Sequence, residues 1–124
     1  PGAGDLQDLS FTTGDQHGIP LYEHVAHLAQ EWNTADNIGL VVGATQPEAL
    51  LRVRKAAPDA WLLVPGVGVQ GADLETALKC GLREDGKGML ISVSRSLSRA
   101  EDVRRAAAEL RDDMVEIKNR MDHD

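Results

Sequence analysis

Residues 60–71 read AWLLVPGVGVQG and join a short apolar run to a glycine-rich loop. The run from Ala60 to Val64 is continuous rather than alternating, which is typical of a buried strand in a parallel sheet. A short helix is expected directly after the loop, from Asp73 to Cys80. Strand, loop and helix in this order form the repeating unit of a parallel α/β fold, so the stretch predicts one βα unit.

The same order recurs on both sides of this stretch. Upstream, the apolar run 38–42 precedes the segment 45–48, whose capping-box pattern opens a helix that we expect to stop near Pro58. Downstream, the run 88–93 precedes a second capping box, from Ser98 to Glu101, and a long final helix. The apolar face expected for that helix comprises Val103, Ala107, Leu110, Met114 and Ile117.

A helix starting at Pro20 is expected before the first strand, because proline suits the first helical position. Its predicted apolar face comprises Leu21, Val25, Leu28 and Trp32. The alternation predicts an α/β fold with three parallel strands, flanking helices and right-handed crossovers. A (β/α)₈ barrel typically needs about 250 residues, and this chain has 124. We therefore expect one partial barrel domain, 1–124, with a loop over 1–18 and the helix and three βα units over 19–124.

Composition narrows the class of protein. The formal net charge of −7 argues against a general nucleic-acid or membrane-surface role, and no apolar stretch approaches a membrane span. The single cysteine, Cys80, excludes an internal disulfide and fits a reducing compartment. The chain begins at Pro1 without an initiator Met, which we interpret as the mark of a truncated, processed or cleaved product.

Ligands of parallel βα arrays gather where strands end and helices begin. After the second strand, a glycine-rich loop can bring backbone N–H groups close to an anion, and Gln70 adds a side-chain amide. Arg95 directly follows the third strand and carries a guanidinium suited to phosphate. Neighbouring strand ends would place both on one face and form an anion site. A plain tight turn and a surface arginine remain the alternative interpretation.

Other candidate sites are weaker. His24 and His27 are three residues apart on a helix, but no third metal ligand is evident and we expect solvent-facing side chains. Cys80 has no histidine partner and is expected to be a buried small residue. Lys87 stands in a turn before a strand, on the side opposite the proposed site. Gly66-Val67-Gly68 is not a dinucleotide fingerprint, since no acidic residue ends a following strand at the expected distance.

The motifs taken together resemble those of the orotidine 5′-monophosphate decarboxylase family, in its bacterial branch. They are the segment 39–48, with Gly43-Ala44-Thr45 at its centre, the segment 64–71 with the pattern PGxGxQG, and Ser94-Arg95. Pro1-Gly2 is similar to the end of the family's Ser-Asn-Pro-Gly segment, which follows the fifth barrel strand. The resemblance runs over nearly the whole chain, and the motifs keep their order and spacing.

The resemblance implies the C-terminal half of a (β/α)₈ TIM barrel, whose three strands are the sixth, seventh and eighth. It implies a carboxy-lyase that converts orotidine 5′-monophosphate to UMP and CO₂ in pyrimidine biosynthesis, without metal or organic cofactor. By the family pattern, Pro65 lies against the pyrimidine, Gly68 belongs to the binding loop, and Gln70 bridges phosphate and base. Arg95 would clamp the phosphate, assisted by backbone N–H groups near Ser94.

The sequence departs from the family in the catalytic Asp-x-Lys-x-x-Asp motif. Asp85-Gly86-Lys87 matches only its first positions, and Leu90 stands where the last Asp belongs. No catalytic residue is therefore expected in this chain; the N-terminal half of the barrel would supply the lysine and aspartates. A homodimer in the cytoplasm is also expected. The alternatives are a non-catalytic nucleotide-binding half-barrel and a fragment of another phosphate-binding barrel, which the Gln70 motif disfavours.

Half a barrel has unpaired sheet edges and leaves apolar surface in contact with water. We expect Val41, Leu63 and Ile91 to point either into the barrel or onto the helices, and half a barrel would leave much of that apolar surface in contact with water. We therefore expect the chain to be found with its N-terminal half or with a second copy of itself.

Overall fold

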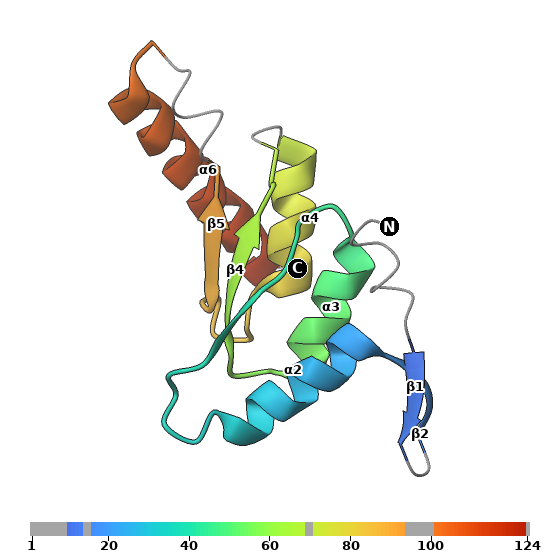
Figure 1. Cartoon of the computed structure of the whole chain (residues 1–124). Helices are drawn as coiled ribbons and strands as arrows, with labels where there is room; N and C mark the ends of the chain where they lie inside the picture. Colours follow the sequence, from blue (N-terminus) through green and yellow to red (C-terminus); the bar gives the residue numbers. More distant parts are fainter. Residues whose placement is uncertain (1–9, 14–15, 69–70, 94–100, 124) are drawn as a thin grey trace.

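The computed structural model describes residues 10–13, 16–68, 71–93 and 101–123. Its central sheet consists of β3 (Gly39–Val41), β4 (Trp61–Pro65) and β5 (Met89–Ser92), paired in parallel in the order β3-β4-β5 (Figure 1). The helices are α2 (Leu21–Trp32), α3 (Pro47–Ala56), α4 (Gly71–Gly81) and α6 (Val103–His123). The predicted α/β order of one helix followed by three βα units is confirmed.

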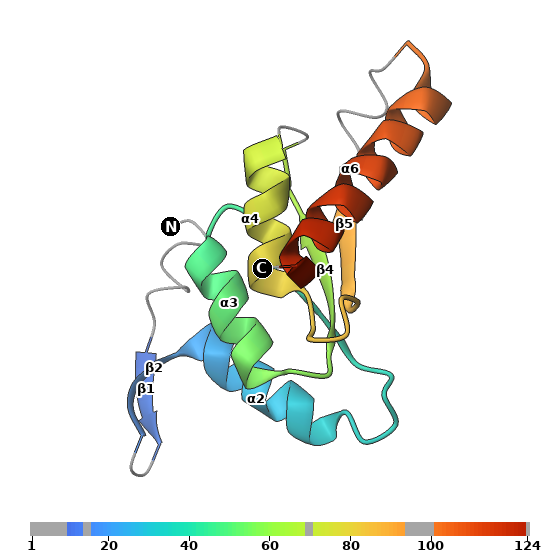
Figure 2. The same ribbon diagram turned by 180° about the vertical axis from the view of Figure 1, so that it is seen from behind.

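The helices cover one face of the sheet, as the view from behind shows (Figure 2). In β4, Leu62 and Val64 are fully buried on this face. They pack into one core with Leu50 of α3 and with Leu74 and Leu78 of α4, all at most 2 % exposed. Aliphatic side chains thus build a core in which each helix lies against the strands that flank it in sequence.

The opposite face of the sheet is open. Val41, Leu63 and Leu90 are aligned across β3, β4 and β5 by the register and are 71 %, 41 % and 57 % exposed. Ile91 is paired with the buried Val64. Because side chains alternate along a strand, that pairing places Ile91 on the helix-covered face. Of the two directions expected for these strand residues, Val41 and Leu63 therefore take the open face and Ile91 the helix-covered face, with Leu90 as the third member of the exposed row.

The N-terminal segment differs from the loop predicted for residues 1–18. Within the described residues, β1 (Ser10–Thr13) and β2 (Gln16–Pro20) form an antiparallel hairpin beside the start of α2 (Figure 1). Thr13 pairs with Gln16, so two residues connect the strands. The sequence signal was present: Gly14-Asp15 is a two-residue connection of the type that hairpins favour, and β-branched Thr12, Thr13 and Ile19 favour strands.

The predicted apolar face of α2 is wrong. Ala26 and Ala29 are its buried residues, and Tyr22 packs on the core from the same face. Val25 and Trp32 are 48 % and 65 % exposed. The small alanines permit close packing of α2 on its neighbours in the core, while Val25 and Trp32 point toward a region that the described residues leave uncovered.

The predicted capping box before α3 does not cap its helix as expected, and most of the second one, from Ser98, lies outside the described residues. The N-cap of α3 is Gln46, without a side-chain capping bond, and Pro47 occupies the first turn. Helix α6 begins at Val103, and the Arg105 N–H donates to Asp102 Oδ1 at 3.0 Å, so Asp102 makes the capping contact. On the expected face of α6, only Ile117 is buried, and Val103 is 51 % exposed. The first turns of α6 extend past the sheet (Figure 1).

Arg54 organises the amino ends of the strands. This residue is only 7 % exposed, and burial together with the nearby Arg83 lowers the pKa of its guanidinium. The guanidinium remains charged at neutral pH, and main-chain oxygens surround it. It donates hydrogen bonds to the carbonyls of Ala57, Pro58, Ala60, Gly81 and Gly88, at 2.7–3.1 Å. One side chain thereby ties the turns after α3 and α4 to the starts of β4 and β5.

Candidate functional site

The segments after β3 and β4 lie side by side at the carboxyl end of the sheet. Pairing continues past the end of β3, since the Val42 N–H donates to Leu63 O at 2.9 Å and the Ala44 N–H donates to Pro65 O at 3.0 Å. The Gly43-Ala44-Thr45 segment is thus hydrogen-bonded to the start of the glycine-rich loop. These two sequence motifs are thereby brought together at the carboxyl end of the sheet.

The first two residues of the loop after β4 differ in backbone conformation and in burial. Gly66 has a φ of +81°, a left-handed conformation that favours glycine. Val67 follows and is buried, at 4 % exposure. Pro65 is exposed on the same face as Leu63, which is the open face of the sheet. A ligand approaching that face at its carboxyl end would meet the Pro65 ring.

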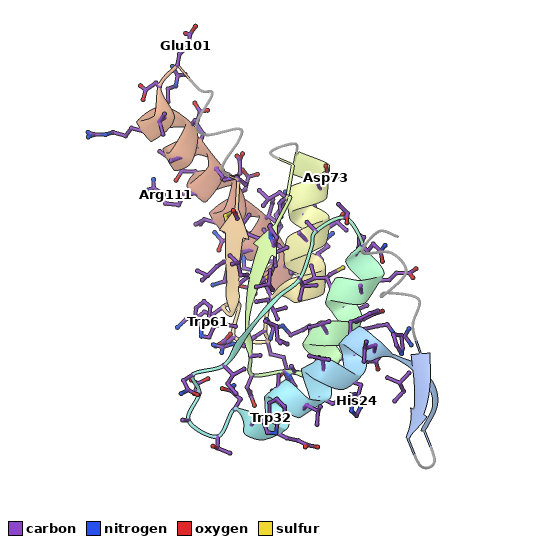
Figure 3. All side chains as sticks on the ribbon, in the orientation of Figure 1. His24, Trp32, Trp61, Asp73, Glu101 and Arg111 are labelled. Atoms are coloured by element: carbon purple, nitrogen blue, oxygen red, sulfur yellow. The ribbon has the colours of Figure 1, made fainter. Side chains whose placement is uncertain are left out.

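A hollow of about 310 Å³ lies between the two segments and the first turns of α3 and α4. Its lining consists of Ala44, Thr45, Pro47, Gly66, Val67, Gly68, Asp73, Thr76 and Ala77. Asp73 is its acidic member, at the end of α4 that faces away from Trp61 (Figure 3). The described lining contains no basic side chain, so an anion here would need a cation from another part of the chain.

The sequence profile described as "Orotidine 5'-phosphate decarboxylase / HUMPS family" matches residues 5–110. The chain belongs to this family. It is 55 % identical over 84 residues to an orotidine 5'-phosphate decarboxylase of Halorubrum lacusprofundi, covering 68 % of this chain and 29 % of the relative. Against that of Haloarcula marismortui it is 48 % identical over 113 residues, covering 91 % of this chain and 38 % of the relative.

Solved structures show the same relationship. The chain is similar to the structure of Leishmania donovani OMP decarboxylase, with a TM-score of 0.80 and 51 % identity, covering 94 % of this chain and 43 % of that one. For Leishmania donovani UMP synthase the TM-score is 0.81 at 53 % identity, covering 94 % and 25 %. The chain therefore spans less than half the length of these decarboxylase-family relatives. Its α/β half-barrel architecture is that of the family.

Two of the predicted binding residues of this decarboxylase-family chain, Pro65 and Gly68, lie in the described residues, where Pro65 accepts the hydrogen bond from Ala44 and Gly68 lines the hollow. Gln70, Ser94 and Arg95 lie outside the described residues, so the expected meeting of Gln70 and Arg95 stays a prediction. The structure does describe the ends of the two strands that precede these residues in the sequence. β4 and β5 end side by side, with Pro65 paired to Ser92, two residues before Ser94.

The partial Asp-Gly-Lys match lies at the amino end, away from this site. Lys87 is exposed and precedes β5, and its N–H donates to Asp85 Oδ1 at 3.0 Å. Hydrogen bonding to Arg83 lowers the pKa of Asp85. The expectation that Lys87 stands opposite the proposed site is confirmed.

The structure also describes the surroundings of the weaker candidate residues, Cys80 and His27. Cys80 is partly rather than fully buried, and burial raises the pKa of its thiol. The imidazole of His27 lies 4.0 Å from Glu23. Among the described residues, no group of three or more His, Cys, Asp or Glu side chains is placed to hold a metal ion. The same part of the chain contains no helix of the length and apolarity that crossing a bilayer requires.

Sequence reasoning missed two residues. Asp73 was noted only as the start of a helix, and Arg54 was not singled out. An aspartate in a first helical turn is commonplace, so no local pattern marked Asp73. Arg54 had no local signal, because two of its acceptors, the carbonyls of Gly81 and Gly88, come from segments that meet it only in the folded chain.

Proposed function

We propose that the protein carrying this chain decarboxylates orotidine 5′-monophosphate to UMP and CO₂, and that this chain supplies the phosphate-binding half of the site. One observation carries the proposal. The Ala44–Pro65 hydrogen bond joins the two family motifs at the carboxyl end of the sheet, in a chain 51 % identical to Leishmania donovani OMP decarboxylase. In such barrels, phosphate sites recur at the last two βα loops.

Each binding residue has a proposed task. The Pro65 ring, exposed on the open face, would lie against the pyrimidine. Gln70 would bridge the phosphate and the base, and Arg95 would clamp the phosphate beside the backbone near Ser94. The phosphate is remote from the reacting carbon, so its binding energy would organise the site rather than take part in bond breaking.

The chemistry would come from the other half of the barrel. As the bond to the carboxylate breaks and CO₂ leaves, the electron pair remains on the ring carbon. A lysine ammonium from the N-terminal half would stabilise that charge and then supply the proton. Lys87, exposed at the amino end of β5, is not positioned for this task.

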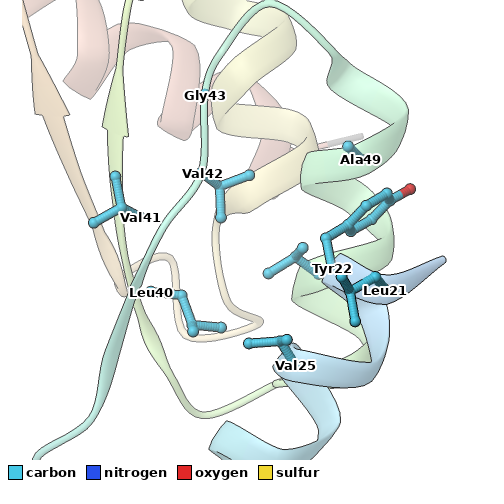
Figure 4. A pocket seen from close by; sticks show the side chains of 9 residues that line it. Leu21, Tyr22, Val25, Leu40, Val41, Val42, Gly43 and Ala49 are labelled. Atoms are coloured by element: carbon cyan, nitrogen blue, oxygen red, sulfur yellow. The ribbon is translucent and has the colours of Figure 1, made fainter. Parts of the chain in front are cut away.

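The open surfaces support a partner that completes the barrel. Within the described residues, β3 and β5 each pair with β4 alone, leaving one unpaired edge on each. Beside the β3 edge lies an apolar hollow of about 340 Å³, where Leu40 and Val42 face Tyr22 and Val25 of α2 (Figure 4). We assign this edge to the N-terminal half of the same barrel. A cytoplasmic homodimer of the completed barrel is part of the proposal.

Complementation between separately produced halves tests this function. Neither this chain nor an N-terminal half should turn over orotidine 5′-monophosphate alone, and mixing them should restore release of CO₂. Sedimentation should show the two halves as one complex. A stable monomer of this chain that decarboxylates unaided would contradict the proposal. A mixture that binds UMP without turnover would favour the alternative of a non-catalytic nucleotide-binding half-barrel.

A further inference from the structure

We propose that the groove beside α6 is the docking site of a helix from the N-terminal half, and that carboxylates on that helix pair with Lys118 and Arg111. This inference rests on the proposed function, in which the N-terminal half completes the barrel. It goes further because it names the kind of element that covers this flank and the charge that the element carries. The edge assigned above to the N-terminal half is that of β3, at the other side of the sheet.

The groove lies in a part of the molecule that leaves apolar side chains exposed. β5 and α6 stand at the edge away from the β1–β2 hairpin (Figure 1, Figure 2). A hollow of about 420 Å³ there is lined by residues of α4, α6 and the starts of β4 and β5. Leu78 and Met89 in its lining are buried, whereas Trp61 and Val115 are 39 % and 52 % exposed. A patch of large exposed apolar side chains is typical of a surface that another element covers.

The charged residues that line this groove are all basic, namely Lys87, Arg111 and Lys118. The chain carries a formal net charge of −7, so a lining with three cations and no carboxylate departs from its average surface. Arg111 is paired with the exposed Asp112 at 2.8 Å, and the backbone N–H of Lys87 donates to Asp85. Among the described residues, Lys118 forms no ion pair. The groove therefore fits a partner that is apolar at its centre and acidic at its margin.

Two of the contacts between neighbouring helices show how such margins are matched in this fold. Between α2 and α3, Glu23 Oε2 lies 3.0 Å from Arg52 Nε. Between α4 and α6, Glu75 Oε2 lies 3.9 Å from Arg120 Nη2. In both, a carboxylate of one helix meets an arginine of the next helix along the chain. A carboxylate on a further neighbouring helix is accordingly the partner that a basic margin of α6 would take.

The basic margin lies on the side of α6 that is turned away from α4. Arg120, which meets α4, and Arg111 are nine residues apart, and that separation is about two and a half turns of an α-helix. The two arginines therefore point to opposite sides. Val115 and Lys118 follow Arg111 by four and seven residues and share its side. This stripe has the spacing that a helix packed alongside would contact.

The unpaired edge of β5 explains why the occupant should be a helix. In a layered βα array, each strand that extends the sheet comes with a helix that packs beside the previous one. Here α3 packs against α4, and α4 packs against α6. A strand of the N-terminal half that pairs with β5 would in the same way bring a helix against Val115 and Lys118. A second copy of this chain is the competing occupant.

The test joins the paired groups directly in the full-length protein. A carbodiimide couples a lysine amine to a carboxylate that touches it, without a spacer between them. Lys118 should become joined to an aspartate or glutamate of the N-terminal half within one molecule, and mass spectrometry of the digested monomer band identifies the residue. A Lys118 that is joined only to carboxylates of residues 1–124, only to a second molecule, or to none would overturn the proposal.

Charge exchange measures what the pairing contributes. Lys118→Glu should lower the urea midpoint of the full-length protein, and changing the cross-linked carboxylate to lysine in that variant should restore most of the loss. The difference should shrink at about 1 M salt, where the screening length is about 3 Å. Arg105→Glu makes the same charge reversal on α6 at a side chain that is 77 % exposed, and this matched control should shift the midpoint less.

The outcomes separate this proposal from the proposed function. Equal shifts for Lys118→Glu and Arg105→Glu, or no recovery in the exchanged pair, would overturn the pairing. The cross-link needs no variant, so it decides the case if Lys118→Glu does not fold. A full-length protein that forms the cross-link without decarboxylating orotidine 5′-monophosphate would refute the proposed function and support the docking site. An active enzyme without the cross-link would support the function and overturn the docking site.

Discussion

The two ends of the three-stranded sheet differ in what their loops are made of. At the amino end, the buried Arg54 guanidinium binds five carbonyl oxygens and closes the turns into a single hydrogen-bonded unit. At the carboxyl end, the loop after β4 contains Gly66 and Gly68, and the exposed Asp73 lines the same hollow. The amino end is built for stability, and the carboxyl end leaves backbone accessible for a ligand, as in (β/α)₈ enzymes generally.

The largest effect should come from the amino end. Arg54→Ala would leave five main-chain carbonyls without their shared donor, and we expect a loss of about 3–5 kcal/mol in the free energy of unfolding. Urea unfolding of the full-length protein measures it. Affinity for UMP in the fraction that remains folded should be unchanged. A variant of wild-type stability would show that the guanidinium does not hold these turns together.

At the carboxyl end, Arg95→Ala should weaken ligand binding and leave the stability of the fold unchanged. Losing a charge-assisted contact costs roughly 1.5–3 kcal/mol of binding free energy, so kcat/KM for orotidine 5′-monophosphate should fall at least about tenfold. Unfolding should stay close to wild type. Activity on the phosphate-free nucleoside is the control, and an equal loss there would refute the assignment of Arg95 to the phosphate.

Gly66→Ala, also at the carboxyl end, should lower the stability of the fold less than Arg54→Ala does. The residue adopts a φ of +81° with nothing within 4 Å of an added Cβ, so strain in the backbone is the main cost. Left-handed conformation costs a non-glycine residue about 1–2 kcal/mol. Thermal unfolding of the full-length protein should register it. A loss as large as that of Arg54→Ala would erase the distinction between the two ends.

The smallest effect is expected for an exposed ion pair at the amino end. The Asp85 carboxylate lies 2.8 Å from Arg83 Nη2, and that hydrogen bond lowers the pKa of Asp85. A carboxyl with a lowered pKa in the folded state stabilises above its unfolded pKa, and the benefit disappears as pH falls through the folded value. Asp85→Asn should therefore be slightly less stable than wild type at neutral pH, and the difference should vanish in acid. A difference independent of pH would implicate shape rather than charge.

Local patterns predicted the sheet better than they predicted its surroundings. The runs 38–42, 60–64 and 88–93 became β3, β4 and β5 to within two residues at each end. The hairpin at residues 10–20 was missed because its strands are short and only partly apolar. The capping-box pattern at Ser98 lies outside the described residues, and the side chain of Asp102, which the sequence did not single out, makes the capping contact at the start of α6.

The sequence predicted where in the fold the candidate site lies, but not which side chains surround its loop. Strand order alone brings the Gly43-Ala44-Thr45 segment next to the glycine-rich loop, because parallel strands end at one edge. The presence of Asp73 and Gly68 in one hollow depends on how α4 packs, which is not encoded in a local pattern. The same holds for which strand residues form the exposed row, since a shift of one residue in register reverses the faces.

The sequence by itself determined the parallel α/β order, the family and the positions of the glycine-rich loop and its neighbours along the chain. Hydrophobic runs and glycine spacing are local properties of the chain, so they can be recognised from the sequence without a structure. Only the tertiary structure decided which face of each element is covered, which carbonyls Arg54 binds and which carboxylate lines the hollow beside Gly68. These contacts join residues up to 34 positions apart in the case of Arg54 and Gly88, and packing alone selects them.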